Sequence, residues 1–161
     1  MGPREKVNNA VTAYLDGLKM LARRELSEAQ VRQRLARKGH EPDAVDAAVS
    51  RLREERALDD ARVAEAIART QTAVRRRGKL RVRREIENAG ITGATARRAL
   101  DEVFDGIDAD AQLQASLAKR LRGREAIADE AEFRRLYRYL IAQGFEADAV
   151  MKALNARRGS R

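Results

Sequence analysis

The densest group of side chains that could do chemistry lies at residues 75–84, Arg-Arg-Arg-Gly-Lys-Leu-Arg-Val-Arg-Arg. Seven of these ten residues are basic and none is acidic. Guanidinium groups present forked N–H donors that match phosphate oxygens, so the run favours contact with a phosphate backbone. The alternative is a basic face that is simply solvated. The residues predicted to bind a polyanion are Arg75, Arg76, Arg77, Lys79, Arg81, Arg83 and Arg84.

A second basic cluster comprises Arg32, Arg34, Arg37 and Lys38, near the end of an expected helix. Cations are common at helix C-termini because they complement the helix dipole, which is the alternative explanation. If the helical units described below stack regularly, the two basic clusters face a similar side. We therefore add these four residues to the predicted binding surface.

The overall charge points the same way. Lys and Arg number 34 against 25 Asp and Glu, giving a net charge of +9 and an isoelectric point of about 10.6. This excess favours a nucleic-acid partner first and an acidic membrane surface second, with solubility alone as the third possibility. Acidic residues are segregated, with five and no basic residue in 99–118. The acidic segments could contact a basic protein surface or simply place carboxylates in first helical turns.

Signals for catalysis are almost absent. The chain has no cysteine and one histidine, His40, which we expect to be a packing or turn residue. It lacks a phosphate-binding GxxxxGK[ST] loop and a dinucleotide-binding GxGxxG motif. We therefore predict no enzyme activity, cofactor or metal. No apolar run approaches the roughly 20 residues that span a bilayer, so we expect a cytoplasmic protein without a membrane partner.

These side chains must be positioned by a weak internal repeat centred on Gly39, Gly90 and Gly144. Apolar residues recur eight and four residues before each glycine, and six and ten residues after it. They are Val31, Leu35, Val45 and Val49, then Val82, Ile86, Ala96 and Leu100, then Leu136, Leu140, Val150 and Leu154. A period on this scale indicates stacked helical units.

Local signals mark the helix ends. Ser27 and Gln30 form a capping-box pattern, and Pro42 fits the first turn of the helix after Gly39. A helix starting at Asp59 or Asp60 is expected to bury Val63, Ile67 and Thr70 and to fray near the arginine run. Each repeat glycine is expected to end a helix in a left-handed conformation.

We predict an all-α protein of three tandem three-helix repeats, helix-turn-helix-like units in an elongated, curved array. The repeats span 13–58, 59–107 and 108–157, between an N-terminal tail at 1–12 and a C-terminal tail at 158–161. In the first repeat, the helix after Gly39 begins with acidic residues such as Asp43 and Asp46. Carboxylates at this helix start would meet DNA phosphates, which disfavours reading of bases in a major groove.

Several segments form a pattern whose order and spacing extend across residues 13–157. They are Leu21-Ala22-Arg23-Arg24-Glu25-Leu26-Ser27, Val31-Arg32-Gln33-Arg34-Leu35, Lys38-Gly39-His40, Ala57-Leu58-Asp59-Asp60-Ala61-Arg62-Val63-Ala64, Gly78 to Ile86 with Gly90-Ile91, and Leu136-Tyr137-Arg138-Tyr139-Leu140 with Gly144-Phe145. In order and spacing this pattern resembles the RecX family.

The resemblance implies a non-enzymatic regulator that inhibits the RecA recombinase in DNA recombination, repair and the SOS response. Such a protein lies as a monomer in the groove of the RecA–DNA filament and suppresses ATP hydrolysis and strand exchange. DNA, single- or double-stranded, would be held through its phosphates. The alternatives are a general nucleic-acid-binding helical-repeat protein without a recombinase partner, and a helical scaffold for an acidic protein.

Overall fold

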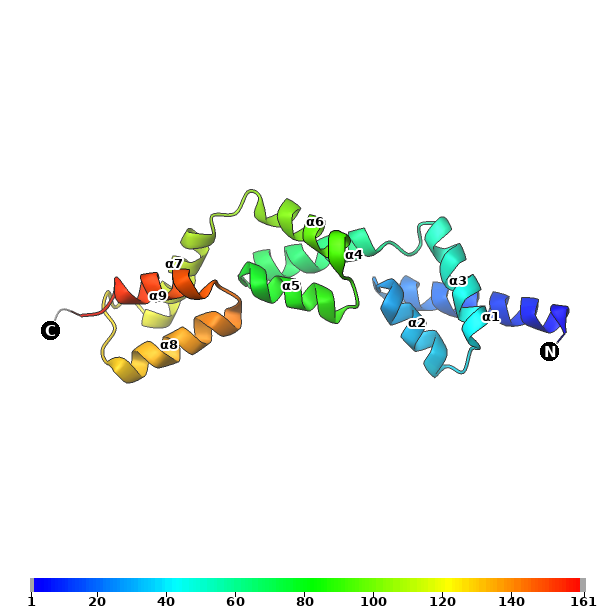
Figure 1. The fold of residues 1–161 in the computed structure, drawn as a ribbon, viewed down its shortest axis with the longest axis horizontal. Coiled ribbons are helices and arrows are strands. Elements are labelled where there is room, and N and C mark those ends of the chain that lie inside the picture. The colour runs from blue at the N-terminus through cyan, green and yellow to red at the C-terminus, as the bar shows by residue number, and fades with distance from the viewer. Residues whose placement is uncertain (1, 160–161) are drawn as a thin grey trace. The chain divides into compact units, whose positions relative to one another are not determined.

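A computed structural model describes residues 2–159, and the all-α prediction is confirmed (Figure 1). The helices are α1 (Pro3–Arg23), α2 (Glu28–Arg37), α3 (Pro42–Glu54), α4 (Asp60–Arg69), the π-helix η1 (Thr70–Val74), α5 (Lys79–Asn88), α6 (Gly93–Phe104), α7 (Ala109–Leu121), α8 (Glu130–Gln143) and α9 (Ala147–Asn155). Within the described residues, β-type pairing is limited to an isolated bridge between Ile127 and Arg158.

The glycine-centred repeat is confirmed. Gly39, Gly90 and Gly144 have φ angles of +90°, +80° and +94°, in the left-handed region that glycine adopts without steric cost. Each of these glycines follows the middle helix of its repeat and turns the chain into the next helix. Every apolar position predicted from the repeat is at most 6% exposed. The repeat is therefore a pattern of core packing as well as of sequence.

The predicted helix starts are also present. The Ser27 hydroxyl accepts a hydrogen bond from the Gln30 N–H at 3.2 Å, and the Gln30 side chain accepts from the Ser27 N–H at 3.0 Å. This reciprocal pair satisfies two N–H groups that have no partner inside α2. Pro42 lies in the first turn of α3, where a missing N–H costs nothing.

Two local predictions are wrong. Residues 3–12 belong to α1 and are not a loose tail, because Pro3 starts the helix and no glycine interrupts it before Gly17. Thr70 is exposed and Thr72 is buried in its place, since the wider π-helical turn of η1 shifts the inward position. In the predicted tails, Met1 and residues 160–161 lie outside the described residues, while Arg158 pairs with Ile127.

By its internal contacts the chain divides into two compact units. Unit 1 comprises Met1–Ala64 and Ile86–Ala96, and unit 2 comprises Glu65–Glu85 and Arg97–Arg161. The apolar core of unit 1 includes Leu26, Val31 and Leu52, and that of unit 2 includes Leu117, Leu140 and Leu154. The helices of the middle repeat contribute to both units. The repeat boundaries at residues 58 and 107 stay predictions.

Inside unit 1, the start of α2 contacts the turn of the following repeat. The Ser27 hydroxyl donates a hydrogen bond to the Ala89 carbonyl, immediately before Gly90. A Cβ atom on Gly90 would overlap the Cβ of Ala29. Glycine is therefore needed at position 90 both for its φ angle and for this close approach.

Inside unit 2, the same contact occurs at the start of α5. The Gly78 N–H donates to the Gln143 carbonyl at 2.9 Å, and the Leu80 N–H donates to the Gly144 carbonyl at 3.1 Å. A Cβ atom on Gly144 would overlap the backbone of Arg81. Ser27 and Gly78 each lie twelve residues before the turn glycine of their own repeat. One type of junction is thus used twice along the chain.

We expect Gly39→Ala, Gly90→Ala and Gly144→Ala to destabilise the fold by different amounts. In all three variants, alanine in the left-handed conformation lowers the free energy of unfolding by about 1–2 kcal/mol. No atom lies within 4 Å of a Cβ built on Gly39, so this conformational cost is the whole effect there. The other two add about 1–3 kcal/mol of overlap at the junctions. Chemical denaturation of the three variants measures the differences.

A rescue variant separates overlap from backbone strain. Ala29→Gly removes the atom that a Cβ at position 90 would meet, so Gly90→Ala should cost less free energy of unfolding in that background. The same change should not rescue Gly144→Ala, which meets backbone atoms. Equal costs for all three glycine substitutions would contradict the junction model.

A second prediction concerns the segment before α8. Glu132 accepts hydrogen bonds from Arg124 and, at 2.8 Å, from the Ala128 N–H, and these contacts lower the pKa of Glu132 to about 2. The carboxylate therefore stabilises the fold fully above about pH 5, and this contribution falls as pH drops toward 2. In Glu132→Gln the loss of stability should be constant above pH 5 and shrink below pH 4. Urea unfolding of both proteins across this pH range measures the difference in free energy of unfolding. A difference that does not change with pH would refute the prediction.

Candidate nucleic-acid interface

A cleft of about 440 Å³ between the C-terminal ends of α1 and α2 gathers six basic side chains in unit 1. Lys19, Arg23 and Arg24 come from α1 and the residue that caps it, and Arg34, Arg37 and Lys38 come from the end of α2; Asp16 and Met20 complete the lining. We call it the α1–α2 basic cleft.

Helix amphipathicity explains why these residues line a surface. Val31 and Leu35 are fully buried on one side of α2, so Arg34 and Arg37 lie on its exposed side. The basic residues occupy the last turns of two helices, where the unpaired carbonyl groups create a negative potential. That potential partly offsets the mutual repulsion of the cations.

One carboxylate neutralises part of the cleft. Asp16 lies 2.8 Å from the Lys38 ammonium and 2.8 Å from His40 Nε2. The bonds from Lys38 and then from His40 lower the pKa of Asp16, so it is ionised at neutral pH. His40 lies in the turn after α2 and contacts Asp16 through its ring. Among residues 2–159, the other five basic side chains of the cleft, Lys19, Arg23, Arg24, Arg34 and Arg37, form no ion pair.

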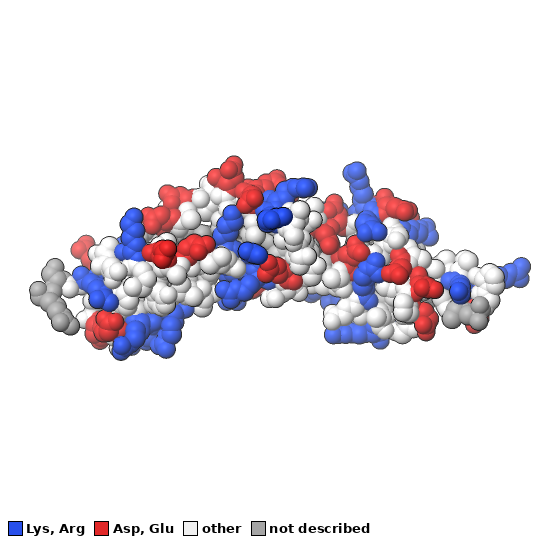
Figure 2. Space-filling view, in the orientation of Figure 1, with Lys and Arg blue, Asp and Glu red and all other residues white. Residues whose placement is uncertain are grey.

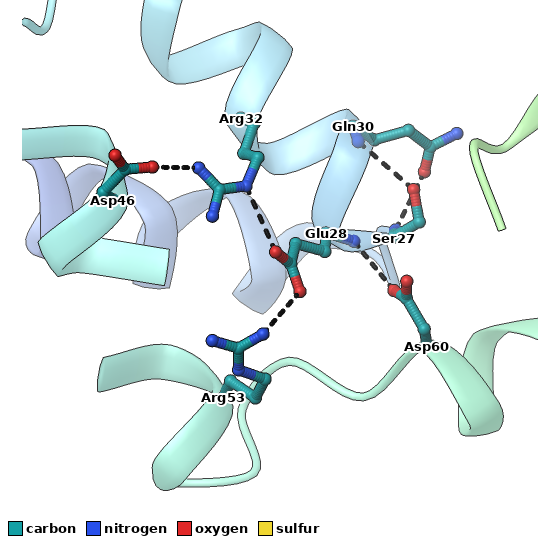
Figure 3. Close-up of polar contacts among 7 residues, drawn as sticks. All are labelled: Ser27, Glu28, Gln30, Arg32, Asp46, Arg53 and Asp60. Atoms are coloured by element: carbon teal, nitrogen blue, oxygen red, sulfur yellow. Dashed lines mark hydrogen bonds and ion pairs between the residues drawn. The ribbon is translucent and has the colours of Figure 1, made fainter. Parts of the chain in front are cut away.

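Arg32 does not line this cleft, although it belongs to the predicted cluster; Figure 3 shows its guanidinium directed at Glu28 and Asp46. It is paired with Asp46 and, at 3.1 Å, with Glu28, and the hydrogen bond with Asp46 is the main cause that raises the pKa of Arg32. Glu28 also reaches Arg53 at 3.4 Å, and its N–H donates to Asp60 at 2.8 Å. Arg32 therefore helps to hold α2 against α3, and Glu28 joins α2 to the start of α4.

In unit 2, part of the predicted basic run is also engaged internally. Arg77 is half-buried and lies 3.7 Å from Glu85, and Lys79 pairs with Asp101 at 3.0 Å. Arg81 contacts Glu85 at 3.3 Å and donates to the Ala142 carbonyl at 3.0 Å. Arg81, which the sequence predicts on an outward basic face, has a side chain that is 33% exposed and lies at the junction between α5 and the end of α8.

The other arginines of the run at residues 75–84 are more exposed. Arg75, Arg76 and Arg84 are exposed and form no ion pair among the described residues. Arg83 is exposed but also interacts with another group. Acidic side chains gather over α6 and its connection to α7 (Figure 2), where Asp101, Glu102 and Asp105 are exposed. The segregation of acid seen in the sequence therefore holds at the surface of unit 2.

Three of the basic cleft residues were not predicted from the sequence. Lys19, Arg23 and Arg24 lie on a different helix from Arg34 and Arg37, and only the packing of α1 against α2 makes them neighbours. The adjacent arginines Arg23 and Arg24, shortly before the Ser27 cap, were the feature of the sequence that could have indicated this cleft. The two predicted clusters belong to different units, so a continuous surface joining them stays a prediction.

The arrangement suits the binding of phosphates. Forked guanidinium groups without carboxylate partners can each take a phosphate oxygen of a strand. Within residues 2–159, no group of three or more His, Asp or Glu side chains could hold a metal ion. No helix in that part of the chain is long and apolar enough to cross a membrane.

We expect the triple variant Arg23→Glu, Arg34→Glu and Arg37→Glu to bind single-stranded DNA more weakly. The slope of log affinity against log salt should fall in magnitude by about 2, because three phosphate contacts are lost. Fluorescence anisotropy with labelled oligothymidylate measures both quantities. Far-UV circular dichroism checks that the helices persist.

The matched control is Arg97→Glu, Arg98→Glu and Lys119→Glu. These residues are exposed outside the basic cleft, and the substitutions change the net charge equally. Their variant should keep the salt slope of the unmodified chain. An identical slope in both triple variants would show that the cleft makes no specific phosphate contacts.

Comparison with known proteins agrees with the repeat. The family model for the first three-helix domain of RecX matches residues 13–52, and that for the second matches residues 59–100. The chain is 35% identical over 140 residues to a regulatory protein RecX of Halorhodospira halophila, covering 86% of this chain and 84% of the relative. It is 31% identical over 151 residues to that of Pseudomonas fluorescens, covering 94% and 95%.

The fold is shared with a solved structure. The crystal structure of RecX from Lactobacillus salivarius superposes with a TM-score of 0.73, covering 92% of this chain and 96% of the other at 16% identity. At this identity the likeness concerns the arrangement of helices. It agrees with a helical repeat array.

Proposed function

The chain belongs to the RecX family of regulatory proteins, and from this premise we propose that it is a non-enzymatic inhibitor of the RecA recombinase. It binds the groove of the RecA–DNA filament and suppresses ATP hydrolysis and strand exchange in recombination and repair. The protein acts as a monomer in the cytoplasm.

The observation that carries the proposal is the α1–α2 basic cleft within a helical-repeat chain of this family. Five of its cations have no ion pair among the described residues, so they are available to a strand of phosphates. At two equivalent junctions, the start of a middle helix donates a hydrogen bond to the turn of the next repeat. A repeat protein of this kind suits a partner that is itself a polymer with a repeating surface.

The contacts within the filament would be of two kinds. Exposed cations such as Arg34, Arg37 and Arg75 contact phosphates or carboxylates. The acidic surface over α6 contacts basic side chains of a recombinase protomer. Arg32, Arg77, Lys79 and Arg81 contribute less, since carboxylates of the chain already hold them.

A general nucleic-acid-binding protein is the second candidate, and the basic cleft supports it equally. The two differ in preference for the filament over bare DNA. An inhibitor of the recombinase binds the nucleoprotein filament more tightly than the same DNA without protein. A general binder shows a steep salt dependence on bare DNA and gains nothing from the filament.

We expect the chain to suppress ATP hydrolysis by RecA on single-stranded DNA, together with strand exchange. The triple cleft variant Arg23→Glu, Arg34→Glu and Arg37→Glu should need about 10-fold more protein for half-maximal inhibition, because phosphate contacts are lost. The Arg97→Glu, Arg98→Glu and Lys119→Glu control should inhibit like the unmodified chain. A coupled ATPase assay with titrated protein measures these values.

The negative outcomes separate the candidates. Unchanged hydrolysis and strand exchange at saturating protein, with bare DNA still bound, would favour the general binder. Absence of binding to both DNA and filament at about 50 mM salt would exclude both, since basic surfaces bind DNA well there. If the cleft variant inhibits as strongly as the unmodified chain, the surface responsible for inhibition lies outside the cleft.

A further inference from the structure

A groove of about 500 Å³ in unit 2 is separate from the α1–α2 basic cleft. Thr72 and Ala73 of η1 line one wall, and Val103, Ile107 and Gln112 line the wall formed by the end of α6 and by α7. The lining is mostly apolar, and its charged members, Arg69 and Arg76, both lie on the η1 side. The sequence pattern did not predict this groove.

The π-helical segment shapes one wall of the groove. Its wider turn places Thr72 inward, only 7% exposed, while the chain leaves η1 through Arg76 at a φ of +52°. Short π-helices are uncommon and often occur at functional sites. A left-handed arginine is likewise an unusual conformation that the surrounding fold must maintain.

Buried polar atoms without partners concentrate at the same place. Among residues 2–159, those on side chains are Gln71 Oε1, Thr72 Oγ1, Arg77 Nε and Gln112 Oε1. Three belong to residues 71–77, and the fourth belongs to Gln112 on the facing wall. Buried polar groups are almost always hydrogen-bonded, so this concentration needs an explanation. Thr72 and Gln112 both line the groove, on its two facing walls.

The chemistry of these atoms discriminates between ligands. Gln112 Oε1 accepts hydrogen bonds and does not donate them, so it requires an N–H or O–H group. A phosphate backbone offers only acceptors and would leave Gln112 Oε1 without a partner. A peptide backbone offers an N–H for Gln112 and a carbonyl for the Thr72 hydroxyl. The apolar lining suits an aliphatic side chain.

The charged wall adds a second requirement. Arg76 is exposed and forms no ion pair in the described part of the chain. Arg69 pairs with Glu65 at 3.3 Å, but its side chain is 67% exposed, and such surface pairs exchange readily. A carboxylate beside the aliphatic residue would complement this wall.

We propose that this groove binds a short protein segment in which an aliphatic side chain adjoins an acidic one. The aliphatic side chain packs on Ala73, Val103 and Ile107. The peptide N–H bonds to Gln112 Oε1, the peptide carbonyl accepts from Thr72, and the carboxylate pairs with Arg76. The site goes beyond the proposed function, because binding there needs neither DNA nor a recombinase.

The test is to pan a phage library of random peptides on the full chain and, in parallel, on Gln112→Leu. The expected result is enrichment on the unmodified chain of peptides with an aliphatic residue next to Asp or Glu. Gln112→Leu should not enrich them. No enrichment, the same enrichment on both proteins, or enriched peptides without a carboxylate would each overturn the proposal.

An enriched peptide, labelled and with capped ends, then tests each contact by fluorescence anisotropy. Arg76→Glu should weaken binding about 10-fold, and Thr72→Val about 3-fold, as expected for one charge-assisted and one neutral hydrogen bond. Arg98→Glu is the matched control, since this arginine is exposed but does not line the groove. Equal losses from Arg98→Glu and Arg76→Glu would overturn the assignment of Arg76.

The free protein supplies a further check. If the Thr72 hydroxyl has no partner there, Thr72→Val should leave the melting temperature unchanged or raise it. A clear decrease would show that the hydroxyl is already satisfied and remove the basis of the proposal. Loss of oligothymidylate affinity in Gln112→Leu, without any peptide binding, would reassign the groove to nucleic acid.

Discussion

The structure depends on one type of hydrogen bond to a turn carbonyl, made twice. The residue just before the middle helix of one repeat donates to the carbonyl before the turn glycine of the next: the Ser27 hydroxyl to Ala89, and the Gly78 N–H to Gln143. A side chain on Gly90 or Gly144 would prevent this approach. Because a buried carbonyl needs a partner, the contact both joins successive repeats and limits which residues the turn accepts. Gly39, which no preceding helix contacts, keeps the conformation without the close approach.

The junctions also determine which arginines are available to a partner. Arg81 packs at the second junction and bonds to Ala142, and Arg32 ties α2 to α3 through Asp46. A guanidinium held by a carboxylate must break that contact before it binds a phosphate. Counting basic residues therefore overstates the binding surface. The cations at the ends of α1 and α2, such as Arg34 and Arg37, belong to the available class, because their helices bury the opposite face.

The two candidate sites differ in the chemistry they can recognise. The α1–α2 basic cleft offers charged donors and suits phosphates in any sequence context. The groove beside η1 offers an apolar lining, a buried amide oxygen and an exposed arginine wall, which suits a peptide. The two sites share no lining residue, so each can be altered by substitution without changing the other.

The sequence by itself determined the helices, the turn glycines and the buried apolar positions, because these follow from local periodicity, capping and backbone conformation within about 20 residues. It also identified Arg34, Arg37 and Lys38 as part of a basic surface. Tertiary structure alone decided that Lys19, Arg23 and Arg24 join them and that Arg77, Lys79 and Arg81 have internal carboxylate neighbours. It also decided that η1 turns Thr72 inward in place of Thr70. Electrostatic pairing and groove shape depend on distances between residues remote in sequence, and a one-dimensional pattern does not contain those distances.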